Sequence, residues 1–194
     1  MKRAMRPEDA SNAPPLLAVD ERVLGPEHPE TVAVRHNLAA FTGQAGDAAA
    51  ARDQHAALLP IYERMLGPEH PNALGSRHNL AGWTGKAGDP DAARDQCAEL
   101  LADYVRVLGP EHPSTLNTRR SLGDWTGEAG DPAAASRLFA EVLPVYEAVL
   151  GAQHQHTQAA RQSLARWTGQ AGHPAKAPRP EPRRVVGSAE CGCS

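Results

Sequence analysis

The sequence predicts an all-α protein, an α-solenoid in which antiparallel helix pairs stack side by side. The first reason is a fixed period: Leu24, Leu66, Leu108 and Leu150 begin four related copies of one hexapeptide, 42 residues apart. A period in this range is typical of stacked-repeat proteins. The second reason is composition, because aromatic residues make up only 4% of the 194 residues and alanine is abundant. That composition suits close helix packing better than a sheet.

The hexapeptide marks the border between two helices. Three copies read Leu-Gly-Pro-Glu-His-Pro, and the fourth, from Leu150, reads Leu-Gly-Ala-Gln-His-Gln. Gly25-Pro26 ends one helix. Pro29 lacks an N–H and has a preset φ, so it suits the first position of the next helix. We expect that helix to reach about Thr42 and to be closed by Gly43 in the left-handed conformation.

A second helix completes each unit. Asp47 is a good N-cap for a helix from about Ala48 to Leu66. Apolar residues recur along it at spacings of three and four, which predicts one buried stripe. His55 lies on this stripe, and Cys97 and Phe139 occupy its position in the later units. We expect all three to be core residues.

The repeat also sets the domain organisation. We expect a disordered lead over residues 1–15, a helical array over 16–172 and a disordered, proline- and arginine-rich tail over 173–194. The array divides into a half unit, three full units and a terminal helix, at 16–24, 25–66, 67–108, 109–150 and 151–172. Both ends lack a polar capping helix, so apolar surface is expected to be exposed there.

Charge and motif content narrow the functional class. The net charge of -3 gives no basic field for nucleic acid or an anionic membrane. No apolar run is long enough for a signal peptide or a membrane span, and three cysteines, two of them Cys191 and Cys193 in the tail, favour a reducing, cytoplasmic setting. No catalytic motif or phosphate loop is present. We therefore expect no enzyme activity, no cofactor and no metal.

The recurring motifs carry a family resemblance. They are the hexapeptide, Arg-His-Asn-Leu-Ala at residues 35–39 and 77–81, and Thr-Gly-x-Ala-Gly-Asp beginning at Thr42, Thr84 and Thr126. Together they resemble the tetratricopeptide repeat, in the 42-residue variety found in kinesin light chains and actinobacterial arrays. The resemblance covers roughly residues 16–172. It implies a right-handed superhelix whose first helices line a concave groove that holds a peptide or partner segment.

The resemblance also implies binding residues. In kinesin-light-chain-like repeats, an asparagine before the Leu-Ala of the first helix contacts the backbone of the bound peptide. Asn37 and Asn79 match this position, whereas the later units have Ser121 and Ser163. A hydroxyl offers fewer hydrogen bonds than a carboxamide, which puts a continuous clamp over all four units in doubt.

One arginine recurs in every unit, and two interpretations of it stay open. Arg35, Arg77, Arg119 and Arg161 are an alternative, anion-binding ladder for carboxylates or phosphates. They are otherwise structural, each pairing with a loop glutamate such as Glu27. Residues two apart on a helix are about 200° apart around its axis, so Arg35 and Asn37 cannot both line one groove.

Two further residue sets have a functional and a structural interpretation. His28, His70, His112 and His154 are metal ligands or residues that pack at a helix start. Stacked helices lie about 8–10 Å apart, too far for equivalent histidines to share zinc. Phe41, Trp83, Trp125 and Trp167 are a base-stacking ladder or part of the core. We expect core, with Trp167 the least covered because no unit follows it.

These observations predict a non-enzymatic scaffold that binds a peptide or partner chain through the concave face. One alternative is a structural protein that self-associates through its uncapped ends. Another is a fragment of a larger repeat-containing signalling or regulatory protein.

Overall fold

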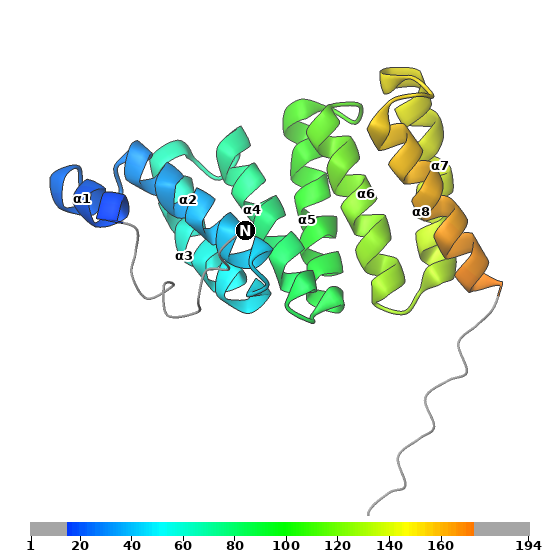
Figure 1. Cartoon of the computed structure of the whole chain (residues 1–194). Helices are drawn as coiled ribbons and strands as arrows, with labels where there is room; N and C mark the ends of the chain where they lie inside the picture. The colour runs from blue at the N-terminus through cyan, green and yellow to red at the C-terminus, as the bar shows by residue number, and fades with distance from the viewer. Residues whose placement is uncertain (1–14, 173–194) are drawn as a thin grey trace, which may run out of the picture.

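The computed structural model describes residues 15–172, which form a single extended row of α-helices (Figure 1). The eight helices are α1 (Pro15–Val23), α2 (Pro29–Gln44), α3 (Ala48–Leu66), α4 (Pro71–Lys86), α5 (Pro90–Leu108), α6 (Pro113–Glu128), α7 (Pro132–Leu150) and α8 (Gln155–Ala171). The predicted lead and tail lie outside the described residues, apart from Pro15, where α1 begins. Cys191 and Cys193 also lie outside them.

The elements of the described chain are all α-helices, and each packs against the next one in the chain. The prediction of an all-α solenoid is therefore confirmed. Helices α2 and α3, α4 and α5, and α6 and α7 are the three full pairs. Helix α1 precedes them as a short second helix, and α8 follows as a first helix. Contacts between alternate helices join α4 to α6 and α6 to α8. The chain therefore stacks by nearest neighbours, as the period predicts.

The hexapeptide histidine is the N-cap of the following helix. Nδ1 of His28 accepts a hydrogen bond from the Glu30 N–H at 3.3 Å, with Pro29 in the first helical position. The same bond forms at His70, His112 and His154. Because a cap satisfies a backbone donor that has no partner inside the helix, it explains why this histidine recurs.

The second helices begin as predicted. The Asp47 carboxylate accepts from the Ala50 N–H at 2.9 Å, and Asp89 and Asp131 repeat this bond. The predicted role of Gly43 is wrong, because α2 continues through it to Gln44. Gly46 is instead the residue with positive φ, at 110°. Gly43 is needed for a close approach, because a Cβ there would collide with the ring of Trp83 from the next repeat.

Both helices of each pair contribute buried residues to the core. His55, Cys97 and Phe139 are all 0% exposed, which confirms them as core residues. The larger apolar cluster joins α6, α7 and α8, and contains Leu116, Ala135, Phe139, Val142, Tyr146, Ala160 and Trp167. A smaller cluster of Leu74, Leu100 and Tyr104 joins α4 and α5. The larger continuous apolar cluster therefore lies toward the C-terminal end of the row.

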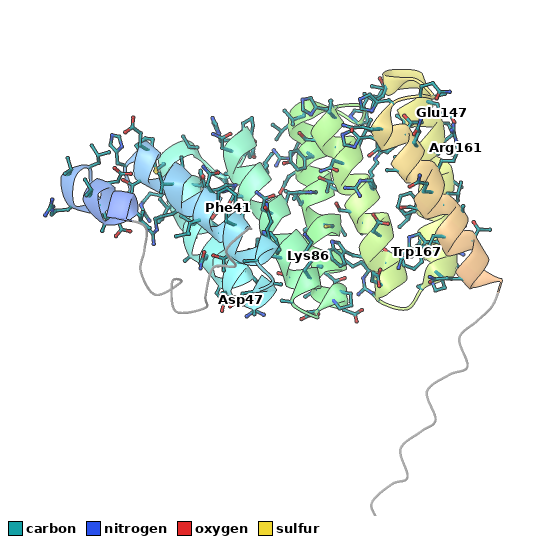
Figure 2. All side chains as sticks on the ribbon, in the orientation of Figure 1. Phe41, Asp47, Lys86, Glu147, Arg161 and Trp167 are labelled. Carbon is teal, nitrogen blue, oxygen red and sulfur yellow. The ribbon has the colours of Figure 1, made fainter. Side chains whose placement is uncertain are left out.

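The exposure of the first-helix aromatic residues is the reverse of our prediction, which made Trp167 the least covered of the four. Trp167 is 1% exposed, whereas Phe41 is 65% exposed. Each tryptophan ring lies on a glycine of the preceding repeat: Trp83 on Gly43, Trp125 on Gly85 and Trp167 on Gly127. Phe41 has no preceding first helix in the described chain, so its ring faces solvent (Figure 2).

Candidate functional site

The first helices α2, α4, α6 and α8 share one face of the array, which we call the A face. It is defined by the equivalent residues Asn37, Asn79, Ser121 and Ser163. Contacts between alternate helices join α4 to α6 and α6 to α8, and none of similar extent joins α3 to α5 or α5 to α7 in the described chain. First helices thus lie closer together than second helices. We call the side on which successive first helices approach one another the inner side of the row.

Two of the four predicted A-face residues bind neighbouring repeats. Nδ2 of Asn79 lies 3.2 Å from Nε2 of His36, and the Ser163 hydroxyl donates to Asp124 at 3.1 Å. Asn37 is exposed, and Ser121 is partly buried. The four side chains therefore do not form a uniform row of free hydrogen-bonding groups.

Histidines that the sequence analysis did not single out join successive repeats. His78 contacts Nδ2 of Asn117 through Nε2 at 3.2 Å, and its Nδ1 lies 3.3 Å from the Thr118 hydroxyl. His36 contacts Asn79 through the same ring nitrogen, although Asn79 stands four residues later in its repeat than Asn117 does. The sequence signal for these contacts between repeats was the histidine that precedes each asparagine in the Arg-His-Asn motif. Its meaning depends on a partner about 40 residues away, which no local pattern reveals.

The middle of the A face exposes helix backbone. Gly75 and Gly82 flank Asn79 at helical spacings of four and three, so all three lie on one side of α4. Apart from the chain neighbours and the nearby backbone of α4 itself, no described atom lies within 4 Å of the position that a Cβ would take at either glycine. A helix-interior glycine is about 1 kcal/mol less favourable than alanine. Since no internal packing requires these two glycines, they leave backbone accessible to another chain.

Most of the predicted arginine ladder is occupied by the protein's own carboxylates. Arg35 pairs with Glu21 at 3.8 Å, Arg77 with Asp103 at 2.6 Å, and Arg161 with Glu147 at 2.5 Å. Figure 2 shows the last pair on neighbouring helices α7 and α8. Glu27, the loop glutamate expected to pair with Arg35, binds Arg64 instead. Arg119 is the exception, with no ion pair inside the described chain.

Titratable groups are also buried between α2 and α3. The His36 and His55 rings meet edge-on with centroids 4.9 Å apart. Burial, and secondarily the charge of His36, lower the pKa of His55 to about 4. Burial raises the pKa of the Cys97 thiol to about 12, so the thiol is protonated at neutral pH and is a poor nucleophile. No cluster of three or more metal-ligating residues occurs among residues 15–172.

Comparison with known proteins places this geometry in a family. The pattern described as tetratricopeptide repeat matches residues 33–96 and 73–148. This chain belongs to the tetratricopeptide repeat family. Such repeats generally form protein–protein interaction modules and are typically non-catalytic. A search of curated proteins finds no match.

Solved structures of similar repeat proteins support the assignment. A point variant of a putative kinesin light chain from Podosopora anserina, with nearly identical TPR-like repeats, is 26% identical, with a TM-score of 0.71. The parent protein is also 26% identical, with a TM-score of 0.69. Each comparison covers 85% of this chain and 78% of the other. The array is thus structurally similar to kinesin-light-chain-like repeats. No helix in the described part is long and apolar enough to cross a membrane.

Proposed function

We propose that this tetratricopeptide repeat protein is a scaffold that binds an extended peptide segment along the A face. The observation that carries the proposal is the open backbone of α4, where Gly75 and Gly82 flank Asn79 on the inner side of the row. A peptide can approach the helix closely there. The carboxamide of Asn79 offers a donor and an acceptor to a peptide backbone.

The surroundings of this strip support peptide binding in the middle of the row. Asn79 is oriented by His36 of the preceding repeat, and Asp124 accepts from both Ser163 and the Trp167 Nε1–H. Side chains fixed in this way lose less conformational entropy when a ligand binds. Asn37 is exposed and provides a further polar contact toward the N-terminal end.

Peptide display on the immobilised protein tests the proposal. Peptides selected on the wild type are re-assayed against Gly82→Trp, which places a large ring where no described atom lies nearby. Asn79→Ala tests the carboxamide. Ala102→Trp is the matched control, because Ala102 is exposed on the second helix α5. We expect Gly82→Trp to weaken binding at least about tenfold, a loss of about 1.4 kcal/mol, and Ala102→Trp to preserve it. Equal binding by both variants contradicts an A-face site.

Self-association through the N-terminal end is a second candidate, favoured by Phe41. The equivalent tryptophans are each packed on the first helix of the preceding repeat, but the Phe41 ring is 65% exposed. A first helix from a second copy would cover this ring in the same way. Such a head-to-tail contact need not close into a ring, so the assembly would grow with concentration.

Light scattering coupled to size-exclusion chromatography separates the two candidates. Self-association predicts a mass that rises with concentration in the wild type and stays at the monomer value in Phe41→Glu. Val149→Glu adds the same charge to another exposed position, 39% exposed on α7, and is the control. A wild type that is monomeric at every concentration rules out this second function and leaves peptide binding unaffected.

A further inference from the structure

Arg119 differs from the other arginines at its repeat position. Each of the other three holds a carboxylate of the chain itself, at 3.8, 2.6 and 2.5 Å. Within residues 15–172, the Arg119 side chain has neither an ion pair nor a hydrogen bond, although it is only partly exposed. A half-buried guanidinium without a carboxylate is the exception in this array.

The cause is visible in the repeat itself. Glu147 lies 14 residues before its partner Arg161, and the residue 14 before Arg119 is Val105. Asp103 lies 26 residues after its partner Arg77, and the residue 26 after Arg119 is Val145. Both positions that supply a carboxylate to the other arginines are thus occupied by valine around Arg119. The guanidinium is kept, but its internal partner is replaced by apolar surface.

Arg119 lines a pocket of about 290 Å³ between α5, α6 and α7. The other lining residues are Leu101, Leu122, Leu138, Glu141 and Val142. Leu138 stands where the first two repeats have Gln54 and Gln96, so the third repeat has a more apolar wall. Glu141 makes no ion pair in the described chain, with Arg119 or any other residue. The pocket thus combines an unpaired cation with aliphatic walls.

We propose that this pocket binds a partner peptide in which an aliphatic side chain adjoins an Asp or Glu side chain. The carboxylate pairs with Arg119, whose planar guanidinium can bind it through two hydrogen bonds. The aliphatic side chain packs against Leu101 and Leu138. The equivalent arginines hold side-chain carboxylates, so the expected source is an acidic side chain and not a chain terminus.

This second site is independent of the A face. Four of its lining residues come from the second helices α5 and α7, and the other two, Arg119 and Leu122, come from α6; none of them is an A-face residue or one of the two open glycines of α4. A scaffold with both sites can hold two segments at once, or two parts of one partner.

Capped dipeptides test the pocket without knowledge of the natural partner. Acetyl-Leu-Glu-amide is titrated into isotope-labelled full-length protein, with amide chemical shifts as the measurement. Acetyl-Leu-Gln-amide removes only the charge, and acetyl-Ala-Glu-amide removes the aliphatic side chain. N-acetyl-leucine places the carboxylate at a chain terminus. We expect the Leu-Glu peptide to shift amides near Leu101, Arg119 and Leu138, and the other three compounds to bind at least about tenfold more weakly.

A variant that restores the repeat supplies the decisive control. Val105→Glu gives Arg119 the internal carboxylate that Glu147 gives Arg161, so it should abolish peptide binding while preserving the fold. Arg119→Ala should do the same, and Glu141→Gln should tighten binding by removing a like charge. Val23→Glu adds a charge at the distant helix α1 and should bind as the wild type does. Circular dichroism of each variant checks that the array is folded.

Several results overturn the proposal. Equal binding of the Leu-Gln and Leu-Glu peptides shows that no carboxylate is recognised. Wild-type affinity in folded Val105→Glu shows that Arg119 is not the receptor. Preference for N-acetyl-leucine assigns the pocket to chain termini, and shifts confined to the A face assign the dipeptide to the groove. Because none of these results depends on display-selected peptides, failure here leaves the proposed A-face function standing.

Discussion

At Gly127 the absence of a side chain decides how two repeats meet. A Cβ there would lie 2.6 Å from the ring of Trp167, which is 1% exposed. The buried ring has no room to move away, so only glycine allows this approach. Gly82 is also a glycine inside a first helix, but the position of its missing Cβ faces open space. Of these two glycines inside first helices, Gly127 is required by packing inside the array, whereas Gly82 is not.

We therefore predict opposite effects of one substitution at these two sites. Gly127→Ala should lower the free energy of unfolding by about 1–3 kcal/mol, because overpacking displaces a buried ring. Gly82→Ala should raise it by about 0.5–1 kcal/mol, because alanine is the better helix former. Urea unfolding followed by circular dichroism measures both. A neutral Gly127→Ala would show that the Trp167 contact is loose.

His55 is the clearest case of a polar residue without a polar partner. It is 0% exposed, and neither ring nitrogen has a hydrogen bond within the described structure. Its pKa is about 4 in the folded chain, against an ordinary value of 6.5. The unfolded chain therefore takes up the proton more readily. The part of the free energy of unfolding that depends on neutral His55 is fully present above about pH 7 and is lost as the pH falls from 6.5 toward 4.

We predict that His55 alone makes the array about 2 kcal/mol less stable at pH 5 than at pH 7. In the third repeat the equivalent position is Phe139, whose ring requires Gly123 opposite it. The double variant His55→Phe with Ala39→Gly transplants that pair into the first repeat. Urea titrations at the two pH values should show a loss that is smaller by about 2 kcal/mol in the double variant. An unchanged pH dependence would locate the acid sensitivity in other groups, such as His36 and His78, whose pKa values burial also lowers.

At the scale of the element, equivalent helices in different repeats can be compared directly. Helices α5 and α7 begin with Pro90 and Pro132 after an aspartate cap, whereas α3 begins with Ala48. The cap residues Asp47 and Asp89 have similar ψ values, 76° and 74°. The backbone before Ala48 is therefore already suited to a following proline.

Ala48→Pro should consequently stabilise the array. Proline at the first helical position removes no helical hydrogen bond and reduces the freedom of the unfolded chain, which is worth about 0.4–1 kcal/mol. The thermal midpoint should rise by about 1–4 °C for a chain of this size. Ala49→Pro, one position further, is the control for a nonspecific effect of proline. A lower midpoint for Ala48→Pro would show that α3 starts differently from α5 and α7.

At the scale of the whole molecule, stability should be distributed unevenly along the row. Each helix contacts mainly its neighbours, and α1 has the least extensive contact with the rest. The larger buried cluster lies across α6, α7 and α8. Local opening is easiest where few apolar contacts hold an element.

Hydrogen exchange should reveal this gradient. Amides of α1 and α2 should exchange fastest and those of α6 and α7 slowest, with α4 and α5 between them. Mass spectrometry of peptic fragments measures the order. Leu116→Ala, in the larger cluster, should accelerate exchange in α6–α8 more than in α2 and α3. Uniform protection from α1 to α8 would instead indicate one cooperative unit.

The candidate sites show where sequence reasoning stopped. The recurrence of Asn37 and Asn79 was visible in the sequence, but the contact of Asn79 with His36 needed two repeats in register. The arginine position was also visible. That three arginines hold carboxylates while Arg119 does not depends on which helices face each other.

The sequence by itself determined the helix pairs, their order and their borders. Those features are local: a histidine or aspartate cap, a proline in the first turn and a glycine at positive φ act within a few residues of where they stand. Only the tertiary structure decided which neighbouring repeat covers each first-helix aromatic residue. Because tryptophans pack backward onto glycines, Trp167 is buried and Phe41 is exposed, and this contact spans about forty residues of chain. Periodicity shows that a face is buried, but the neighbour that covers it is fixed only when the helices stack.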